Sequence, residues 1–170
     1  MAYAREKGLS VVTVRFFNTA GPRQSGSYGM VLPRFIQQAS LGKPLTVYGD
    51  GAQVRSFSHV KDVVRAAADL SLEPKASGKI FNVGNDKPVT IRALAQKVRK
   101  KLNSDSELRY IPLNKAYGSF SAGFEDIGCR IPNLSKVKKL INYKPKYDLD
   151  AIIEDAARYY RNKKKGGAIA

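Results

Sequence analysis

One short run of β-branched and aromatic residues, Ser10–Phe17, limits the folds open to this chain more than any other segment. It reads SVVTVRFF, a composition typical of a largely buried strand. Such a strand needs a neighbour on each edge and helices over its faces. Only the end of a helix, residues 3–7 closed by Gly8, precedes it. The opening therefore predicts the C-terminal half of a parallel α/β architecture whose preceding strand–helix units have been removed.

The rest of the chain alternates between helical and strand patterns without an internal repeat. Apolar residues at helical spacing, with Thr90 and Asp148 as caps, predict helices over 31–41, 60–70, 91–102, 132–141 and 149–160. In the helix after His59 the apolar stripe includes Val64. Short β-branched runs predict strands over 44–48, 55–59, 79–83 and 108–111. This mixture predicts the α/β class.

Composition excludes several kinds of protein. One cysteine, Cys129, and one histidine, His59, rule out a disulfide framework and argue against a Cys/His zinc site. No apolar stretch reaches the ~18 residues that a membrane-spanning helix needs. The first residues mix both charges and lack the apolar core of a signal peptide. We expect a cytoplasmic protein that holds no metal and does not enter a membrane.

The chain is strongly basic, with 30 Lys and Arg against 14 Asp and Glu and a net charge of +16. A pI near 10 attracts polyanions such as nucleic acid, acidic membranes or phosphorylated ligands. Most of the excess lies on the polar sides of predicted helices, for example Lys97–Lys101 and Lys136–Lys139. Such positions are typical of solvated helix faces. The pattern favours that interpretation over a dedicated nucleic-acid surface.

Motifs in a fixed order give the more specific signal. The segment RFFNTAGPR, residues 15–23, places an Asn, a Gly-Pro turn and an Arg where a strand ends, and open α/β sheets bind ligands at such ends. After it come YGMVLP (28–33), VYGDG (47–51), RSFSHVKDV (55–63), FNVGN (81–85), GFED (123–126) and RIPN (130–133). In this order they resemble the C-terminal half of the NAD-dependent nucleotide-sugar epimerase/dehydratase family, the extended short-chain dehydrogenase/reductases. UDP-glucose 4-epimerase-like and UDP-glucuronate decarboxylase-like members are the most similar.

The resemblance implies a role for eight residues. Asn18 matches the residue that contacts the diphosphate, and Arg55 and Arg130 match the two arginines that clamp it. Val31 and Leu32 match the helix start that meets the uracil edge, and Tyr48 the aromatic residue that covers the base. Phe16 and Thr19 match positions that line the nicotinamide side of the NAD pocket. The chemistry agrees, because a nucleotide diphosphate needs guanidinium groups, helix N-terminal amides and a flat apolar surface.

Each assignment has a purely structural alternative. Asn18 can stabilise the turn before Gly21. Tyr48 can be a half-buried strand residue, and Arg55 can pair at the surface with Asp50 or Asp62. His59 is best read as a strand-end residue whose ring is satisfied, and Asp62 as a charge in the first turn of a helix. Asn133 stands where the family usually has an acidic residue, which leaves a helix cap but removes a charge.

Two family features are missing from these residues. Gly49-Asp50-Gly51 is followed by Ala52-Gln53-Val54 and so fails the G-x-G-x-x-G pattern of the NAD phosphate loop. Tyr3 and Lys7 match the catalytic Tyr-x-x-x-Lys spacing literally, but they lie at the end of their helix instead of near its start. That offset is about 20 Å along a helix. We therefore interpret the pair as a coincidence, and expect no catalytic residue here.

The resemblance implies a nucleotide-sugar-binding half that is catalytically incomplete by itself. We expect a last helix–strand remnant of the Rossmann sheet over residues 1–24, a substrate-binding domain over 25–162 and a flexible tail over 163–170. The intact family uses NAD, and we expect weak or no NAD binding here. The expected partners are a UDP-type nucleotide sugar and either a second copy of the chain or the missing Rossmann half. The alternative is a basic binding module for nucleic acid or another polyanion.

Overall fold

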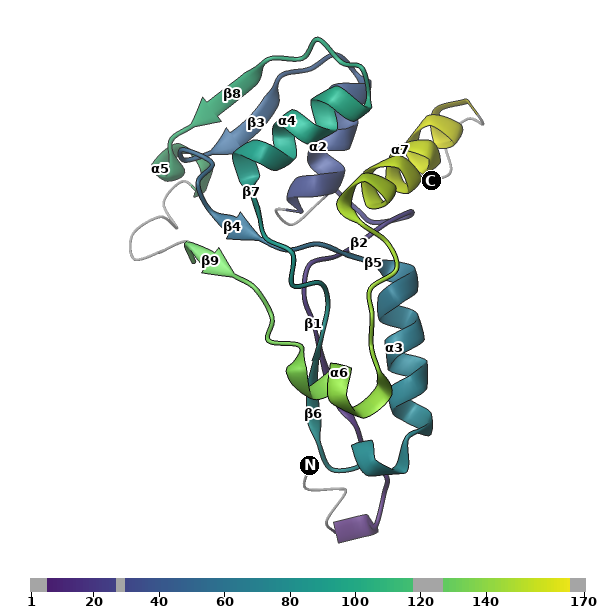
Figure 1. Ribbon diagram of the computed structural model, residues 1–170. Helices are drawn as coiled ribbons and strands as arrows, with labels where there is room; N and C mark the ends of the chain where they lie inside the picture. The colour runs from purple at the N-terminus through teal and green to yellow at the C-terminus, as the bar shows by residue number, and fades with distance from the viewer. Residues whose placement is uncertain (1–5, 27–29, 118–126, 166–170) are drawn as a thin grey trace.

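The computed structural model describes residues 6–26, 30–117 and 127–165. Its elements gather around two apolar cores, one in the lower and one in the upper part of Figure 1. Three short strand pairings connect the two parts. No helix among the described residues is long and apolar enough to cross a membrane.

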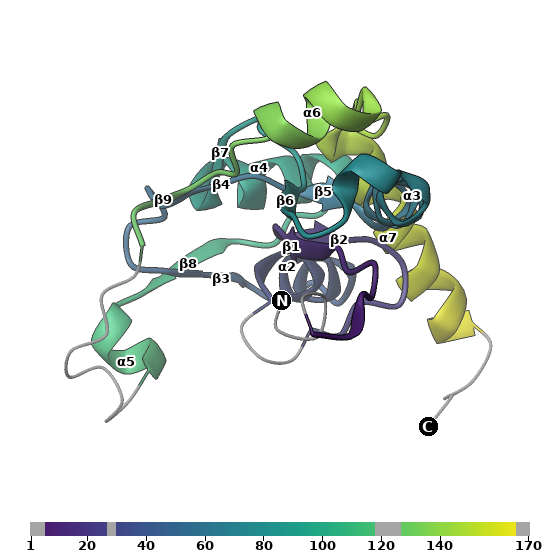
Figure 2. The ribbon, with the colours of Figure 1, turned by 90° about the horizontal axis from the view of Figure 1, so that it is seen from below.

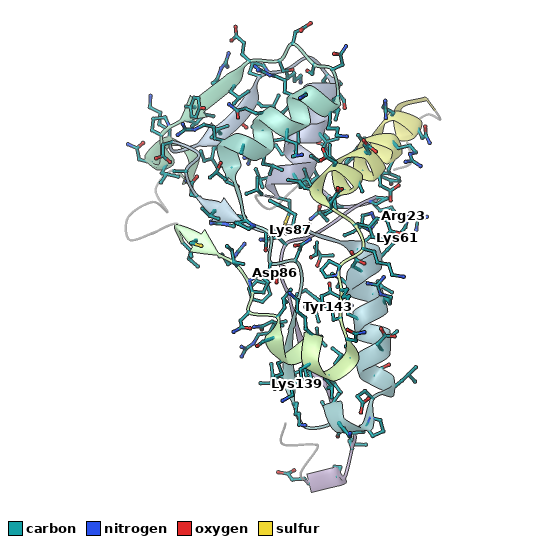
Figure 3. The ribbon with its side chains drawn as sticks, in the orientation of Figure 1. Arg23, Lys61, Asp86, Lys87, Lys139 and Tyr143 are labelled. Atoms are coloured by element: carbon teal, nitrogen blue, oxygen red, sulfur yellow. The ribbon has the colours of Figure 1, made fainter. Side chains whose placement is uncertain are left out.

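The lower part is built on a parallel pair of strands. Strand β1 (Thr13–Phe16) pairs with β6 (Ile80–Val83), and helices α3 (Val60–Leu72) and α6 (Ser135–Ile141) pack against the pair. A 3-10 turn, η1 (Pro74–Ala76), follows α3. The buried residues of this core are Val63, Ala66, Leu70, Ala76, Phe81, Val83, Leu134, Val137 and Tyr143. The Tyr143 hydroxyl donates to the Gly84 carbonyl oxygen, 2.8 Å away, and so ties the end of α6 to the end of β6 (Figure 3).

The upper part packs three helices against a second parallel pair. The helices are α2 (Val31–Ser40), α4 (Ile91–Lys101) and α7 (Leu149–Lys165), and the strands are β3 (Leu45–Tyr48) and β8 (Leu108–Ile111). A short helix, α5 (Leu113–Tyr117), follows β8. Seen from below, β3 and β8 run side by side (Figure 2), and α2 and α4 pack against each other and against β3.

Short strands join the two parts. Strand β2 (Thr19–Ala20) pairs in parallel with β5 (Ser58–His59). Strand β4 (Val54–Arg55) lies between β7 (Val89–Thr90), which is antiparallel to it, and β9 (Cys129–Arg130), which is parallel. The chain therefore crosses between the parts from β1 to α2, from β3 to α3, from β6 to α4, from α5 to α6 and from α6 to α7. Residues of the first, second and fourth of these crossings line the cleft described below.

The helix predictions are confirmed, including their caps. The Thr90 hydroxyl accepts a hydrogen bond from the Ala93 amide (3.1 Å), and the Asp148 carboxylate accepts one from Ala151 (2.9 Å). The predicted helix over 132–141 begins later, at Ser135, with Leu134 as its N-cap residue. The Asn133 side chain accepts the Ser135 amide at 2.9 Å in the turn that precedes the helix. Helix α7 continues to Lys165, and residues 166–170 of the predicted tail lie outside the described residues.

Three expectations about strands and burial are wrong. Strand β1 is shorter than 10–17 and mostly exposed, because among the described residues it pairs only with β6 on one edge; Phe16 is 57% exposed. The predicted strand 55–59 is two pieces, β4 and β5, since each pairs with different strands. Val64 is 62% exposed, because α3 buries the face that carries Asp62, Val63 and Ala66. The domain boundary at residue 24 stays a prediction.

Replacing Gly51 by Ala is expected to lower the free energy of unfolding by about 2 to 3 kcal/mol, because strain and overpacking add. Gly51 has a φ of +72°, and an added Cβ would lie 2.8 Å from a Val47 methyl and 3.1 Å from the Arg92 amide. Gly42→Ala is the matched control: its φ is +64°, but nothing lies within 4 Å of the added Cβ. Chemical denaturation of both variants measures the difference, and equal losses would contradict the packing contribution.

Candidate functional site

A cleft of 1320 Å³ lies between the two parts of the molecule. Its walls come from the end of β1, the first turn of α2, the outer side of α3 and the strand ends of β3, β4 and β9. All eight residues that the sequence singles out line this one cleft: Phe16, Asn18, Thr19, Val31, Leu32, Tyr48, Arg55 and Arg130. They span more than a hundred positions in the sequence, and the fold brings all of them together.

The cleft is positively charged. Four arginines line it, Arg15, Arg34, Arg55 and Arg130, and no Asp or Glu is among its described lining residues. Guanidinium groups are always charged and bind phosphates with paired N–H donors. A concave surface lined by one sign of charge concentrates ions of the opposite sign. The cleft is therefore suited to an anionic ligand.

Two of the lining residues, Asn18 and Arg130, are hydrogen-bonded to each other. Asn18 follows β1 with a φ of +37°, a conformation that Asn tolerates better than most residues. Its amide nitrogen donates to the Ser56 carbonyl (2.8 Å), and its side-chain oxygen accepts from an Arg130 guanidinium nitrogen (2.9 Å). Asn18 thus stabilises the local backbone, as the structural alternative holds, and also orients a cleft arginine.

Arg55 is anchored by main-chain oxygens. One of its guanidinium nitrogens donates to the carbonyls of Val54 (2.9 Å) and Ile127 (2.7 Å), so the side chain fastens the segment before β9 to β4. Asp62, one of the two acidic partners considered from the sequence, pairs instead with Arg65 at 2.9 Å. Arg55 consequently lines the cleft in a fixed orientation and also has a structural task.

Tyr48 and the start of α2 form the upper wall. The Tyr48 ring is half-buried at the end of β3, and the Arg34 guanidinium carbon lies 4.2 Å from the ring centroid. Val31 and Leu32 begin α2, and no side chain of the described residues caps that helix start at Met30. The amides of a helix's first turn carry partial positive charge. This wall combines a flat aromatic surface with backbone donors.

Phe16 and Thr19, from the segment at the end of β1 and from β2, also line the cleft. Phe16 offers an exposed apolar ring, and the Thr19 hydroxyl is buried without a hydrogen-bond partner among the described residues. A nicotinamide cofactor needs such a wall but also a glycine-rich cradle for its pyrophosphate. The described residues fit one wall of a cofactor pocket and not the whole of it.

His59 lies at the end of β5, where its ring packs and forms hydrogen bonds inside the fold. The fully buried His59 accepts the Lys61 amide at Nδ1 (3.1 Å), so its proton is on Nε2, which faces an Asp155 oxygen at 3.1 Å. The ring stacks on Tyr147, with centroids 4.2 Å apart. Lys61, labelled in Figure 3 at the start of α3, also donates to Asp155 of α7 (3.3 Å). Both ring nitrogens of His59 are therefore satisfied, as the sequence predicts.

Falling pH is expected to weaken this cluster. Burial acts to raise the pKa of Asp155, but hydrogen bonds from Lys61 and His59 and the Lys61 charge outweigh it and leave the pKa below its ordinary value. A lowered carboxyl pKa stabilises the fold above the unfolded pKa of about 3.9, and this stability is lost as pH falls through the folded pKa. Asp155→Asn should lower stability at pH 7 more than at pH 3 in chemical denaturation. An equal loss at both values would contradict the assignment.

Besides apolar lining residues, sequence reasoning missed the polar cleft residues Arg15, Gln24, Arg34, Gln53 and Ser71. Arg34 could have been found, because it lies three positions after Val31 and therefore on the same face of the helix start. Gln53 donates to the Tyr48 carbonyl at 3.2 Å, a contact between neighbouring strand ends that no sequence pattern predicts. Across residues 6–26, 30–117 and 127–165, no three His, Cys, Asp or Glu side chains gather into a metal site.

Several sequence predictions fall partly or wholly outside the described residues: the Tyr3–Lys7 pair, the first two residues of the motif at 28–33, and the motif at 123–126. Lys7 ends a helix directly before Gly8, which has a φ of +64°, while Tyr3 lies outside them.

Comparison with known proteins points to one family. Residues 1–84 match the model of the NAD dependent epimerase/dehydratase family. Over 162 residues the chain is 35% identical to a UDP-N-acetyl-alpha-D-glucosaminuronate decarboxylase of Bacillus cytotoxicus, covering 95% of this chain and 49% of that protein. The chain spans from 31% to 49% of the length of the curated relatives it matches.

Solved structures agree with this result. A UDP-glucose 4-epimerase of Thermotoga maritima, determined with UDP-glucose, is 29% identical with a TM-score of 0.84, covering 96% of this chain and 50% of that one. A dTDP-glucose 4,6-dehydratase of Streptomyces venezuelae, determined with NAD, is 26% identical with a TM-score of 0.81, covering 96% of this chain and 48% of that one. The comparisons support the NAD-dependent epimerase/dehydratase family, and the fold is that of these enzymes.

Proposed function

We propose, from the support for the NAD-dependent epimerase/dehydratase family, that this chain is the nucleotide-sugar-binding half of such a protein and that UDP-type nucleotides bind in the cleft. The observation that carries the proposal is the composition of the cleft wall. Four arginines, no carboxylate among the described lining residues and an aromatic ring at one end match an anionic ligand that ends in a flat base.

The diphosphate would lie between Arg55 and Arg130. Both guanidinium groups line the cleft and are held by fixed partners, Arg55 by two carbonyls and Arg130 by Asn18. Fixed donors lose little freedom when a ligand binds, and charged hydrogen bonds are stronger than neutral ones. Asn18 then acts by orienting Arg130 and by lining the diphosphate position.

The base would stack on Tyr48, with the backbone at Val31 and Leu32 meeting its polar edge. The sugar would then extend toward Phe16 and Thr19, where the family places the nicotinamide. NAD bound there would supply reversible oxidation of the sugar. These 170 residues hold neither the G-x-G-x-x-G loop nor a Tyr–Lys pair near a helix start, so we propose that the chain binds NAD weakly and completes a catalytic site only with further residues from a partner.

Exposed apolar side chains around the cleft support a partner surface. Phe16, Met30 and Val64 are 57%, 45% and 62% exposed, and all three line the cleft. Apolar groups gathered at one hollow are typical of an interaction site. The partner would be a second copy of the chain or a Rossmann half.

Titration calorimetry with UDP, UDP-glucose and NAD, each alone, tests the proposal. Charged contacts and stacking must offset several kcal/mol of association cost, so we expect UDP and UDP-glucose to bind with Kd around 1 mM. NAD should bind more weakly. Absence of UDP binding, together with salt-dependent binding of unrelated double-stranded DNA, would replace this function by a basic polyanion-binding module.

A further inference from the structure

Arg34 lines the cleft but has no task in the diphosphate site. We infer that Arg34 is a positioning residue that holds the Tyr48 ring as the stacking surface for a nucleobase. The inference rests on the proposed function, because it assigns how one wall of that same cleft is kept in shape.

Arg34 contacts the end of β3 at two points, the Tyr48 ring and the Thr46 carbonyl. Its guanidinium carbon lies over the Tyr48 ring, 4.2 Å from the centroid. One terminal nitrogen donates to the Thr46 carbonyl at 3.1 Å, two residues before the ring. A guanidinium group is planar and weakly hydrated, so it stacks on aromatic faces more readily than an ammonium group does. The hydrogen bond to Thr46 holds the guanidinium group in place over one face of the ring.

Arg34 has no acidic partner within the described part of the chain, so an ion pair does not explain its position. Its remaining close aromatic neighbour is Phe35, with the guanidinium carbon 5.7 Å from that ring's centroid. The positive charge therefore stays uncompensated beside Tyr48 in a cleft suited to anions. Both its stacking and its charge favour the ligand class proposed above.

Attachment of β3 to α2 does not depend on Arg34. One turn later in the helix, the Gln38 amide nitrogen donates to the Thr46 hydroxyl (2.9 Å), and its oxygen accepts the Thr46 amide (3.1 Å). Gln53 independently holds the Tyr48 carbonyl. The backbone at Tyr48 is thus fixed from both sides without Arg34. What Arg34 adds is contact with the ring itself, whose side-chain torsions the backbone leaves open.

The test compares Arg34→Met with the matched control Gln38→Met, using uridine and UDP as probes in NMR titrations. Uridine has no diphosphate, so it reports the base site without the main charge effect. Arg34→Met should weaken uridine binding about fivefold, the size of a cation–π contact or a loosened stack. Arg34→Lys should recover part of the loss. Gln38→Met, which lies outside the cleft lining, should lower the melting temperature yet leave uridine binding unchanged.

A double-mutant cycle separates positioning from a general structural effect. In the Tyr48→Ala background, Arg34→Met should weaken uridine binding no further, because the ring it holds is gone. Additive losses in the cycle, or equal losses of uridine binding from Arg34→Met and Gln38→Met, would overturn the inference. The proposed function would stand in that case, provided that the wild-type protein binds UDP. If wild-type protein binds neither probe, the proposed function itself has failed. These two failures are therefore distinguishable.

Discussion

Replacing Asp62 by Ala is expected to lower the free energy of unfolding by about 3 to 5 kcal/mol, a large share of the stability of a domain. The Asp62 side chain is fully buried in the first turn of α3. It accepts the backbone amides of Lys146 and Tyr147 at 3.0 and 3.1 Å and pairs with Arg65 at 2.9 Å. Removing the carboxylate leaves two amides and a guanidinium group without their acceptor, and loosens the segment between α6 and α7.

Two control variants separate the contribution of the Asp62 charge from the contribution of its burial. Asp62→Asn keeps one acceptor and should cost less than Asp62→Ala. Asp86 pairs with Lys138 where both side chains are 43% exposed, so Asp86→Ala should cost at most about 1 kcal/mol. Urea denaturation followed by circular dichroism measures all three variants. A similar loss for Asp62→Ala and Asp86→Ala would contradict the role given to burial.

Replacing Arg130 by Ala is expected to weaken UDP binding about tenfold, the lower range for a charged hydrogen bond because the site is open to water and salt. Arg130 is exposed and held by Asn18, so its removal should change the fold little. Uridine binding should change much less, since uridine has no diphosphate to lose. Calorimetry with both ligands measures the contrast.

Two further variants provide comparisons for the Arg130→Ala result. Tyr48→Ala should weaken UDP and uridine by similar factors, because both carry the base. Arg55→Ala should weaken UDP but also reduce stability, since Arg55 holds the Val54 and Ile127 carbonyls. If Arg130→Ala leaves UDP binding unchanged and lowers DNA binding instead, the diphosphate assignment is wrong.

The helices and the cleft residues could be predicted from the sequence because each has a local signal. The apolar spacing of 149–160 and the caps Thr90 and Asp148 act within one or two turns, and the structure has them as expected. The eight cleft residues belong to ordered motifs, each at the end or start of an element. Their convergence in one cleft follows from the fold that the motifs imply.

The exposure of side chains and the contacts between distant segments of the chain could not be predicted in this way. The run at 10–17 has the composition of a buried strand, but burial depends on which elements lie beside it, and β1 is mostly exposed. Val64 fits the predicted helical stripe as well as Val63 does, and only packing against β6 and α6 selects the face that is buried. The helical position of Arg34 is predictable from its spacing to Val31, but its contact with the Tyr48 ring, fourteen positions later, follows no spacing rule in the sequence.

Mapping UDP on the ¹⁵N-labelled protein by NMR tests the central claim most directly. If the cleft is a nucleotide site, amide shifts should concentrate at the end of β1, the start of α2, and around Tyr48, Arg55 and Arg130. They should saturate at millimolar UDP and shrink in Arg130→Ala. Shifts confined to the lysine-rich faces at 97–101 and 136–139, or no saturable shifts at all, would contradict the account.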